Sequence, residues 1–135
     1  MTTTAPSTPA RPTRRNALTT WLIPMVCFVL APPLGGLLGE TPFRFAPTAA
    51  ILAGVAITYL SLVTMIRELN AAAGSSLVPW HLFIPLYGIY WAVVLVPKEM
   101  AVAKQKAGKG PPRGLVVYLL LFLYAFAADL NDLAA

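Results

Sequence analysis

The sequence is poor in the residues that most catalytic and metal sites need. Its 135 residues include one cysteine and one histidine, and only 11% are charged, against about 25% in a soluble globular domain. Cys27 cannot form an internal disulfide and is expected to be a small apolar side chain. The sequence has no Walker loop, dinucleotide-binding fingerprint, nucleophile elbow or zinc spacing. We therefore predict no catalytic, cofactor-binding or metal-binding residues.

What the sequence does have is long apolar stretches, since 58% of its residues are hydrophobic. Four stretches, 16–39, 45–66, 69–97 and 114–128, contain no Asp, Glu, Lys or Arg. The first three reach the roughly 20 residues that cross a hydrocarbon core of about 30 Å. The fourth is long enough only with help from the residues that follow it. This pattern predicts an all-α membrane protein.

The basic residues flank the apolar stretches and do not form a separate cluster. Residues 1–16 are rich in Thr, Pro and Ala and contain Arg11, Arg14 and Arg15, which is typical of a disordered basic tail. Residues 17–135 are then a single transmembrane helical domain. The net charge of +5 is typical of a cytoplasmic membrane face, so we expect no nucleic-acid partner.

The distribution of Lys and Arg favours one topology. If all four stretches cross, the two sides carry four and six basic residues, which gives no clear orientation. If the 77–97 segment enters and leaves by the same face, nine lie on the cytoplasmic side and Arg44 alone lies outside. Pro79, Pro85 and Gly88 would break a helix there. We predict three spanning helices plus a re-entrant hairpin, with the N-terminus cytoplasmic and the C-terminus outside. The alternative is a four-helix transmembrane bundle.

A short repeat supports the hairpin. Arg67-Glu68-Leu69 matches Lys98-Glu99-Met100 at an offset of 31 residues. If the two copies are structurally equivalent, both triplets lie at the same membrane face. Arg67 could then pair with Glu99, and Lys98 with Glu68, as cytoplasmic charge sites.

The same segments resemble a known family. Tyr87-Gly88-Ile89-Tyr90-Trp91 followed by Lys98-Glu99-Met100 resembles the Gly-Ile-Tyr…Tyr-Trp…Lys-Glu-Leu-Asn pattern of an uncharacterised family of small bacterial integral-membrane proteins. Arg67-Glu68-Leu69-Asn70 resembles the other copy of that pattern. The resemblance covers about residues 57–105 and departs from the pattern at Met100-Ala101. It implies a bacterial membrane protein and no particular activity.

Three side chains are candidates for chemistry inside or beside the membrane. His81 could be a proton-relay or ligand group at the mouth of the hairpin, or an interfacial histidine beside Trp80. Asp129 and Asp132 share a helix face and could bind a cation or carry protons. Alternatively, the two carboxylates only terminate the last helix on the non-cytoplasmic side.

Other residues are candidates for helix association and for contacts at the cytoplasmic face. Small residues let helix backbones approach closely in lipid, either inside one protomer or against a partner. These are Gly35, Gly39, Ala46, Ala50, Gly54 and Thr58. The basic residues Lys104, Lys106 and Lys109 lie in a segment that could attract anionic headgroups.

The sequence as a whole indicates a non-enzymatic, multi-pass protein of the bacterial inner membrane. We expect it to be an accessory or scaffolding subunit of a membrane complex, with the lipid bilayer and either another membrane protein or a second copy as partners. The alternative is an oligomeric channel or transporter component, in which His81, Asp129 and Asp132 line a path. No cofactor is expected.

Overall fold

The computed structural model describes residues 12–135, and within that range it contains helices and no strand. Most of the predicted 1–16 tail, including Arg11, lies outside the described residues. The helices are α1 (Ala17–Leu38), α2 (Ala46–Ala73), α3 (Tyr87–Tyr90), α4 (Val96–Lys106), α5 (Leu115–Leu120) and α6 (Phe122–Ala134). A 3₁₀ turn covers Pro79–Phe83, and a π-helical turn at Trp91–Leu95 joins α3 to α4.

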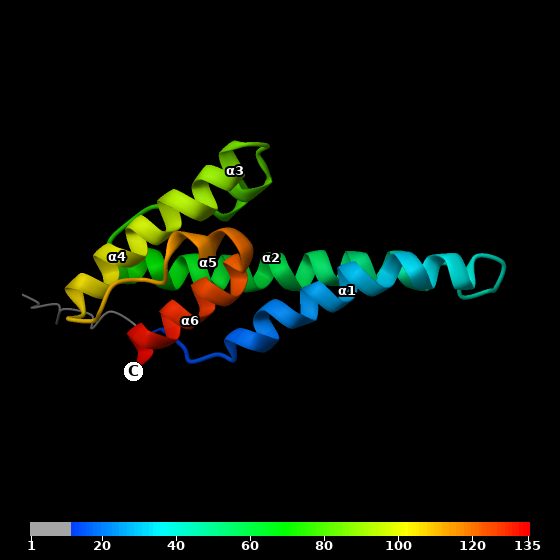
Figure 1. The fold of residues 1–135 in the computed structure, drawn as a ribbon, viewed down its shortest axis with the longest axis horizontal. Coiled ribbons are helices and arrows are strands. Elements are labelled where there is room, and N and C mark those ends of the chain that lie inside the picture. The colour runs from blue at the N-terminus through cyan, green and yellow to red at the C-terminus, as the bar shows by residue number, and fades with distance from the viewer. Residues whose placement is uncertain (1–11) are drawn as a thin grey trace, which may run out of the picture.

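Helices α1 and α2 form an antiparallel pair that projects well beyond the other helices (Figure 1). The Asn16 side chain caps α1 by accepting hydrogen bonds from the N–H groups of Leu18 and Thr19. Helix α2 ends at Gly74, whose φ of 76° is in the left-handed region that favours glycine. Both helices are long and apolar enough to cross a membrane. The rest of the chain buries only 11% of the apolar window in α1 and 22% of that in α2.

The segment after α2 folds back on itself, and residues 75–106 are here called the first hairpin. Its chain reverses at residues 84–87, where Leu86 has a φ of 61°. The N–H groups of Tyr87 and Gly88 donate to the carbonyls of Pro85 and Ile84. A Cβ on Gly88 would lie 2.1 Å from the Leu82 carbonyl oxygen, so only glycine fits. The chain therefore reverses inside the 77–97 segment, where Pro85 and Gly88 predicted a break (Figure 1).

One side chain holds the start of the first hairpin against α2. The Asn70 amide donates to the Leu77 carbonyl at 2.8 Å and accepts from the Leu77 N–H at 2.9 Å. The Ser75 hydroxyl also donates to Asn70, at 2.8 Å. The Asn70 side chain thus pairs both the N–H and the carbonyl of Leu77, which lies outside any helix in the extended stretch after Gly74.

The fourth apolar stretch does not form one long helix. It breaks at Leu121, where φ is −133° and ψ is 47°, and leaves α5 with six residues. The chain then turns back as α6; residues 114–134 are here called the second hairpin. The prediction of three spanning helices is not confirmed, because within residues 12–135 two helices, α1 and α2, are long and apolar enough to span a membrane. The alternative, a four-helix transmembrane bundle, is not confirmed either.

The predicted position of the C-terminus is wrong. The Asn131 side chain accepts from the Arg15 N–H at 2.8 Å and donates to the Arg15 carbonyl. The end of α6 thus lies beside the start of the described chain, at the end of the molecule that holds Lys104 and Arg113. The physical reason is charge, because α6 carries two carboxylates that pair with those basic residues.

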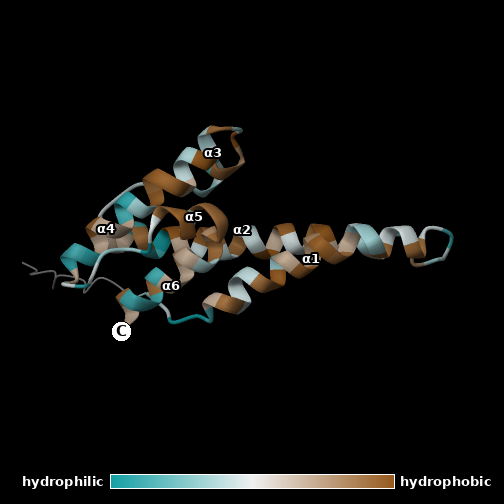
Figure 2. Ribbon diagram, viewed as in Figure 1, coloured by the Kyte–Doolittle hydropathy of each residue, from teal (hydrophilic) through white to brown (hydrophobic). Residues whose placement is uncertain are grey.

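The core lies at that end of the molecule. In α2 it includes only residues after the middle of the helix, starting at Leu62, together with side chains from both hairpins such as Trp91, Met100, Tyr118 and Phe126. Residues 46–61 of α2 contribute nothing to this cluster. Hydrophilic residues gather at two places, the end of the molecule where the C-terminus lies and the loop that joins α1 to α2. The helices between these two places are mostly apolar (Figure 2).

Candidate functional site

The most elaborate polar arrangement in the described chain is centred on Asp129, which α6 places at zero exposure. Its Oδ1 atom lies 2.7 Å from Lys104 Nζ and 2.6 Å from Arg113 Nη1. Its Oδ2 atom accepts from the Arg113 N–H at 3.0 Å and from the Tyr118 hydroxyl at 2.8 Å. The carboxylate thus accepts four hydrogen bonds, which is about its full capacity.

Asp132 completes the charge balance of this cluster. It lies one helical turn after Asp129 on the same face, as the spacing predicted. Its Oδ2 atom lies 2.8 Å from Lys104 Nζ and 3.2 Å from Arg113 Nη1. Two carboxylates therefore share two cations, and the cluster is neutral. We call these five residues, Lys104, Arg113, Tyr118, Asp129 and Asp132, the charge clasp.

The charge clasp shifts the pKa values of two of its members, Asp132 and Arg113. Burial alone would raise the pKa of Asp132, but the hydrogen bond and charge of Lys104 and the charge of Arg113 outweigh it and hold that pKa below its ordinary value. Burial likewise opposes the charged form of Arg113, and the attraction of Asp129 outweighs it, so the pKa of Arg113 is raised. Both shifts favour the ionised pair, as mutual attraction should.

The elements that carry the clasp explain why it forms. Lys104 is in the last turn of α4, where a cation is favoured by the helix dipole. Arg113 lies just before α5, and Tyr118 is inside it. Asp129 therefore ties both limbs of the second hairpin together and anchors them to α4. An interior carboxylate of this kind is stable only when it is paired and hydrogen-bonded.

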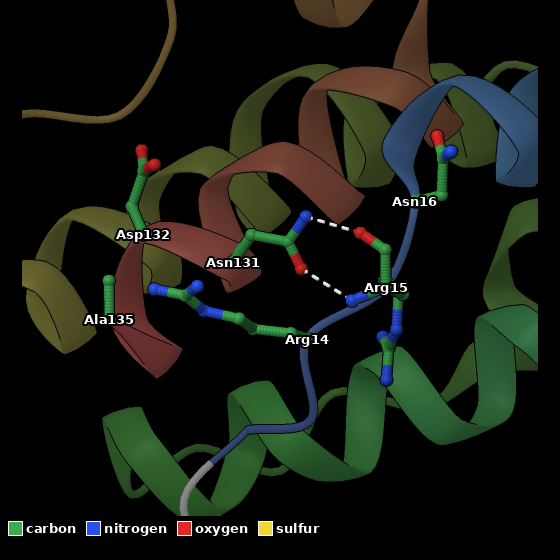
Figure 3. A pocket seen from close by; sticks show the side chains of 6 residues that line it. All are labelled: Arg14, Arg15, Asn16, Asn131, Asp132 and Ala135. Atoms are coloured by element: carbon green, nitrogen blue, oxygen red, sulfur yellow. Dashed lines mark hydrogen bonds between the residues drawn. The ribbon is translucent and has the colours of Figure 1, made fainter.

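A second polar cluster joins the start of the described chain to α2 and α6. Arg15 Nη2 lies 2.6 Å from Glu68 Oε1, and the Thr13 hydroxyl donates to the same oxygen at 2.7 Å. Figure 3 shows both hydrogen bonds between the Asn131 side chain and the Arg15 backbone. It also shows that the Arg15 side chain turns away from Asn131, while Arg14 reaches toward Ala135. An open hollow of about 390 Å³ lies among these residues.

The predicted exchange of ion pairs between the two repeat copies is wrong. Glu68 pairs with Arg15 and not with Lys98. Among residues 12–135 there is also no ion pair between Arg67 and Glu99. Lys106 donates to the Ala73 carbonyl, which joins the ends of α4 and α2. Lys98 and Lys109 are exposed.

His81 lies in the 3₁₀ turn near the tip of the first hairpin, and not at its mouth as predicted. Its ring is 4.6 Å from the Trp80 ring and 5.3 Å from the Tyr87 ring, centre to centre. The charge clasp is at the other end of the hairpin (Figure 1). The structure therefore does not bring His81 together with Asp129 and Asp132.

Two of the six candidate small residues, Gly35 and Gly54, lie where α1 meets α2. A Cβ on Gly54 would be 2.8 Å from the Cys27 Cβ, and one on Gly35 would be 3.9 Å from Pro47. The Thr58 hydroxyl donates to the Gly54 carbonyl. Gly39 has only its own preceding turn nearby, Ala46 is exposed and Ala50 is half-buried. Gly54, and more loosely Gly35, thus lets α1 and α2 of the same chain approach each other.

Several residues that matter here were not singled out from the sequence. Tyr118 and Arg113 complete the clasp, Asn70 holds the first hairpin, and Asn131 holds Arg15. One signal was available, because Asp129 directly follows the apolar stretch 114–128, and a carboxylate that such a segment buries needs a cation.

Comparison with protein-family models, with curated proteins and with solved structures finds no match to this chain. Among residues 12–135, no three His, Cys, Asp or Glu side chains are grouped as metal ligands would be. A carboxylate whose oxygens all accept hydrogen bonds from fixed cations and a phenol has no free position for a substrate cation. The clasp is thus built to hold helices together.

Proposed function

We propose that this chain is a non-enzymatic integral membrane protein of the bacterial inner membrane, and that it serves as an accessory or scaffolding subunit. The observation that supports this best is the closed state of the charge clasp. Its interior carboxylate, Asp129, is fully hydrogen-bonded to side chains and backbone of the same chain. The ionisable groups are therefore used to build a rigid end and not to handle a ligand.

In the proposed arrangement α1 and α2 cross the bilayer and both hairpins enter it from one face. Nine of the ten Lys and Arg residues lie in the described chain, and all except Arg44 belong to the end that carries the clasp. The positive-inside rule then puts that end in the cytoplasm. Both ends of the described chain lie on this side, because Asn131 contacts Arg15.

The exposed apolar surface supports a role in assembly. Large side chains on the projecting pair are open to the surroundings, including Leu37 at 79% and Leu52 at 64% exposure. Lipid or another transmembrane segment can cover such a surface. Exposed basic residues at the other end, such as Lys98 and Lys109, can contact the cytoplasmic part of the same partner.

The oligomeric channel is the second candidate, and it needs a continuous polar path. His81 and Asp129 lie at opposite ends of the first hairpin, and Asp129 faces its own cations. A path through a ring of copies would have to bypass the clasp. The geometry therefore favours the accessory role.

Purification of the intact tagged chain in a mild detergent, followed by mass spectrometry, tests this proposal. We expect a second membrane protein to co-purify with the chain in fixed stoichiometry. Replacing Leu52 and Leu60 together by Ala should abolish this co-purification and leave the thermal stability of the chain unchanged. The matched control is Leu119→Ala with Leu120→Ala, which removes similar exposed apolar surface from the second hairpin. A homo-oligomer whose ion flux is abolished by His81→Ala would contradict the accessory role and favour transport.

Topology is tested separately by cysteine labelling in a Cys27→Ala background. Cysteines that replace Gly110 and Ala135 should react from the same side of the membrane, and one that replaces Thr41 should react from the other. Labelling of positions 110 and 135 from opposite sides would contradict the proposed arrangement.

A further inference from the structure

The molecule is much wider at the end that carries the charge clasp than at the end formed by the loop between α1 and α2 (Figure 1). The core cluster draws α2 side chains only from residue 62 onward and includes both hairpins. Beyond it, α1 and α2 continue as a bare pair (Figure 1). If α1 and α2 cross the membrane as proposed above, the leaflet on the basic side holds them and two hairpins, and the opposite leaflet holds only the pair.

The depth of the hairpins follows from their length. α1 has 22 residues and is about 33 Å long, which is enough to cross a hydrocarbon core of about 30 Å. The helical limb of the first hairpin is continuous from Tyr87 to Lys106, but the part of it before the first charged side chain, residues 87–97, is only about 16 Å long. If Lys98 and the residues after it stay outside the hydrocarbon, the tip of this hairpin reaches about the midplane. α5 has six residues and reaches about 9 Å. The uncharged parts of both hairpins are therefore too short to enter the far leaflet.

The hairpin surfaces fit lipid. At the tip of the first hairpin Leu86 is 83% exposed and Ile89 is 60% exposed, and on the second hairpin Leu120 is 71% exposed. Apolar side chains so exposed at a turn are stable when hydrocarbon covers them. Part of the turn's backbone is also satisfied internally, because Pro85 has no N–H and the N–H groups of Tyr87 and Gly88 donate to the carbonyls of Pro85 and Ile84.

We propose that this chain is a wedge that expands the basic-side leaflet, and that it therefore concentrates where that leaflet is convex. Its partner in this role is the bilayer itself. Each hairpin limb is about 10 Å across and occupies about 80 Å² of a leaflet, so four limbs add roughly 300 Å² to one side only. The charge clasp and Asn70 fix the limbs to α4 and α2, so the wedge cannot flatten by letting the hairpins swing out.

Reconstitution of the full chain into phosphatidylcholine vesicles tests the wedge, because a zwitterionic lipid removes any attraction to the basic end. Small sonicated and large extruded vesicles are compared for protein per lipid. Orientation is read by labelling a cysteine that replaces Gly110 in a Cys27→Ala background. We expect a several-fold higher protein density in the small vesicles, with residue 110 facing outward.

A tip variant separates the wedge from simple insertion. Leu86→Lys with Ile89→Lys should keep the first hairpin out of the hydrocarbon and remove the enrichment. Ala101→Lys with Gln105→Lys adds the same charge at exposed positions of α4 and should leave it unchanged. Equal density in both vesicle sizes, or full enrichment of the tip variant, would overturn the wedge while leaving the accessory role intact. Failure of the chain to float with either vesicle would overturn the membrane arrangement itself.

Discussion

Removing the charge of Asp129 should reveal how much of the fold depends on the clasp. In Asp129→Asn the side chain keeps its shape, but Lys104 and Arg113 lose the carboxylate that both contact. Lys104 is only 4% exposed at its side chain, so water cannot replace the lost partner. Breaking a buried ion pair by removing one member costs about 3–5 kcal/mol. That is a large part of the roughly 5–15 kcal/mol that holds a typical domain together.

The measurement is the free energy of unfolding in detergent, with protease sensitivity of residues 107–135 as a local readout. Asp132→Asn is the matched control. Asp132 contacts the same two cations, Lys104 and Arg113, but its own side chain is 47% exposed. An exposed pair contributes about 0–1 kcal/mol. Equal losses in the two variants, or no loss with Asp129→Asn, would refute the assignment of Asp129 as the interior anchor.

Three further outcomes follow from particular contacts. Gly54→Leu should separate α1 from α2, because a Cβ at this position would already lie 2.8 Å from the Cys27 Cβ. Ala56→Leu changes an exposed position and should leave the two helices together. Crosslinking between α1 and α2 measures the separation. Gly88→Ala should lower the melting temperature strongly, since its Cβ would overlap the Leu82 carbonyl, while Gly36→Ala has open space around it and should be neutral. The pKa of Asp132 is lower in the folded than in the unfolded chain, so its ionised form stabilises the fold above about pH 4 and that contribution is lost as pH falls further. Asp132→Asn should therefore lower stability at neutral pH and flatten its decline in acid, and an unchanged acid profile would contradict the pairing.

The helical class and the first hairpin could be predicted from the sequence because their signals are local. Long uncharged stretches predicted α1 and α2. Pro79, Pro85 and Gly88 predicted a reversal in the 77–97 segment, and the structure has one there. Leu69 and Met100, one from each repeat copy, lie in the same core cluster, and the prediction that both triplets lie at one membrane face stays a prediction.

The second hairpin could not be predicted in that way. Nothing between residues 115 and 128 is a Pro or Gly, so no local residue marks the break at Leu121. The break follows from tertiary pairing, because Asp129 can reach Lys104 and Arg113 only if the chain turns back. The same holds for Glu68, whose partner Arg15 is 53 residues away in sequence. Spacing along a helix cannot reveal a partner that a different element supplies.

The contact between Arg15 and Asn131 joins residues 116 positions apart, so it can form only after α6 has been synthesised. The pair of α1 and α2 is complete much earlier in synthesis, and the end of the molecule that carries the clasp closes later. A chain that stops before α6 would keep the pair of α1 and α2 but leave Lys104 without its two carboxylates. Because an unpaired interior cation is costly, the clasp end of such a truncated chain would not close stably.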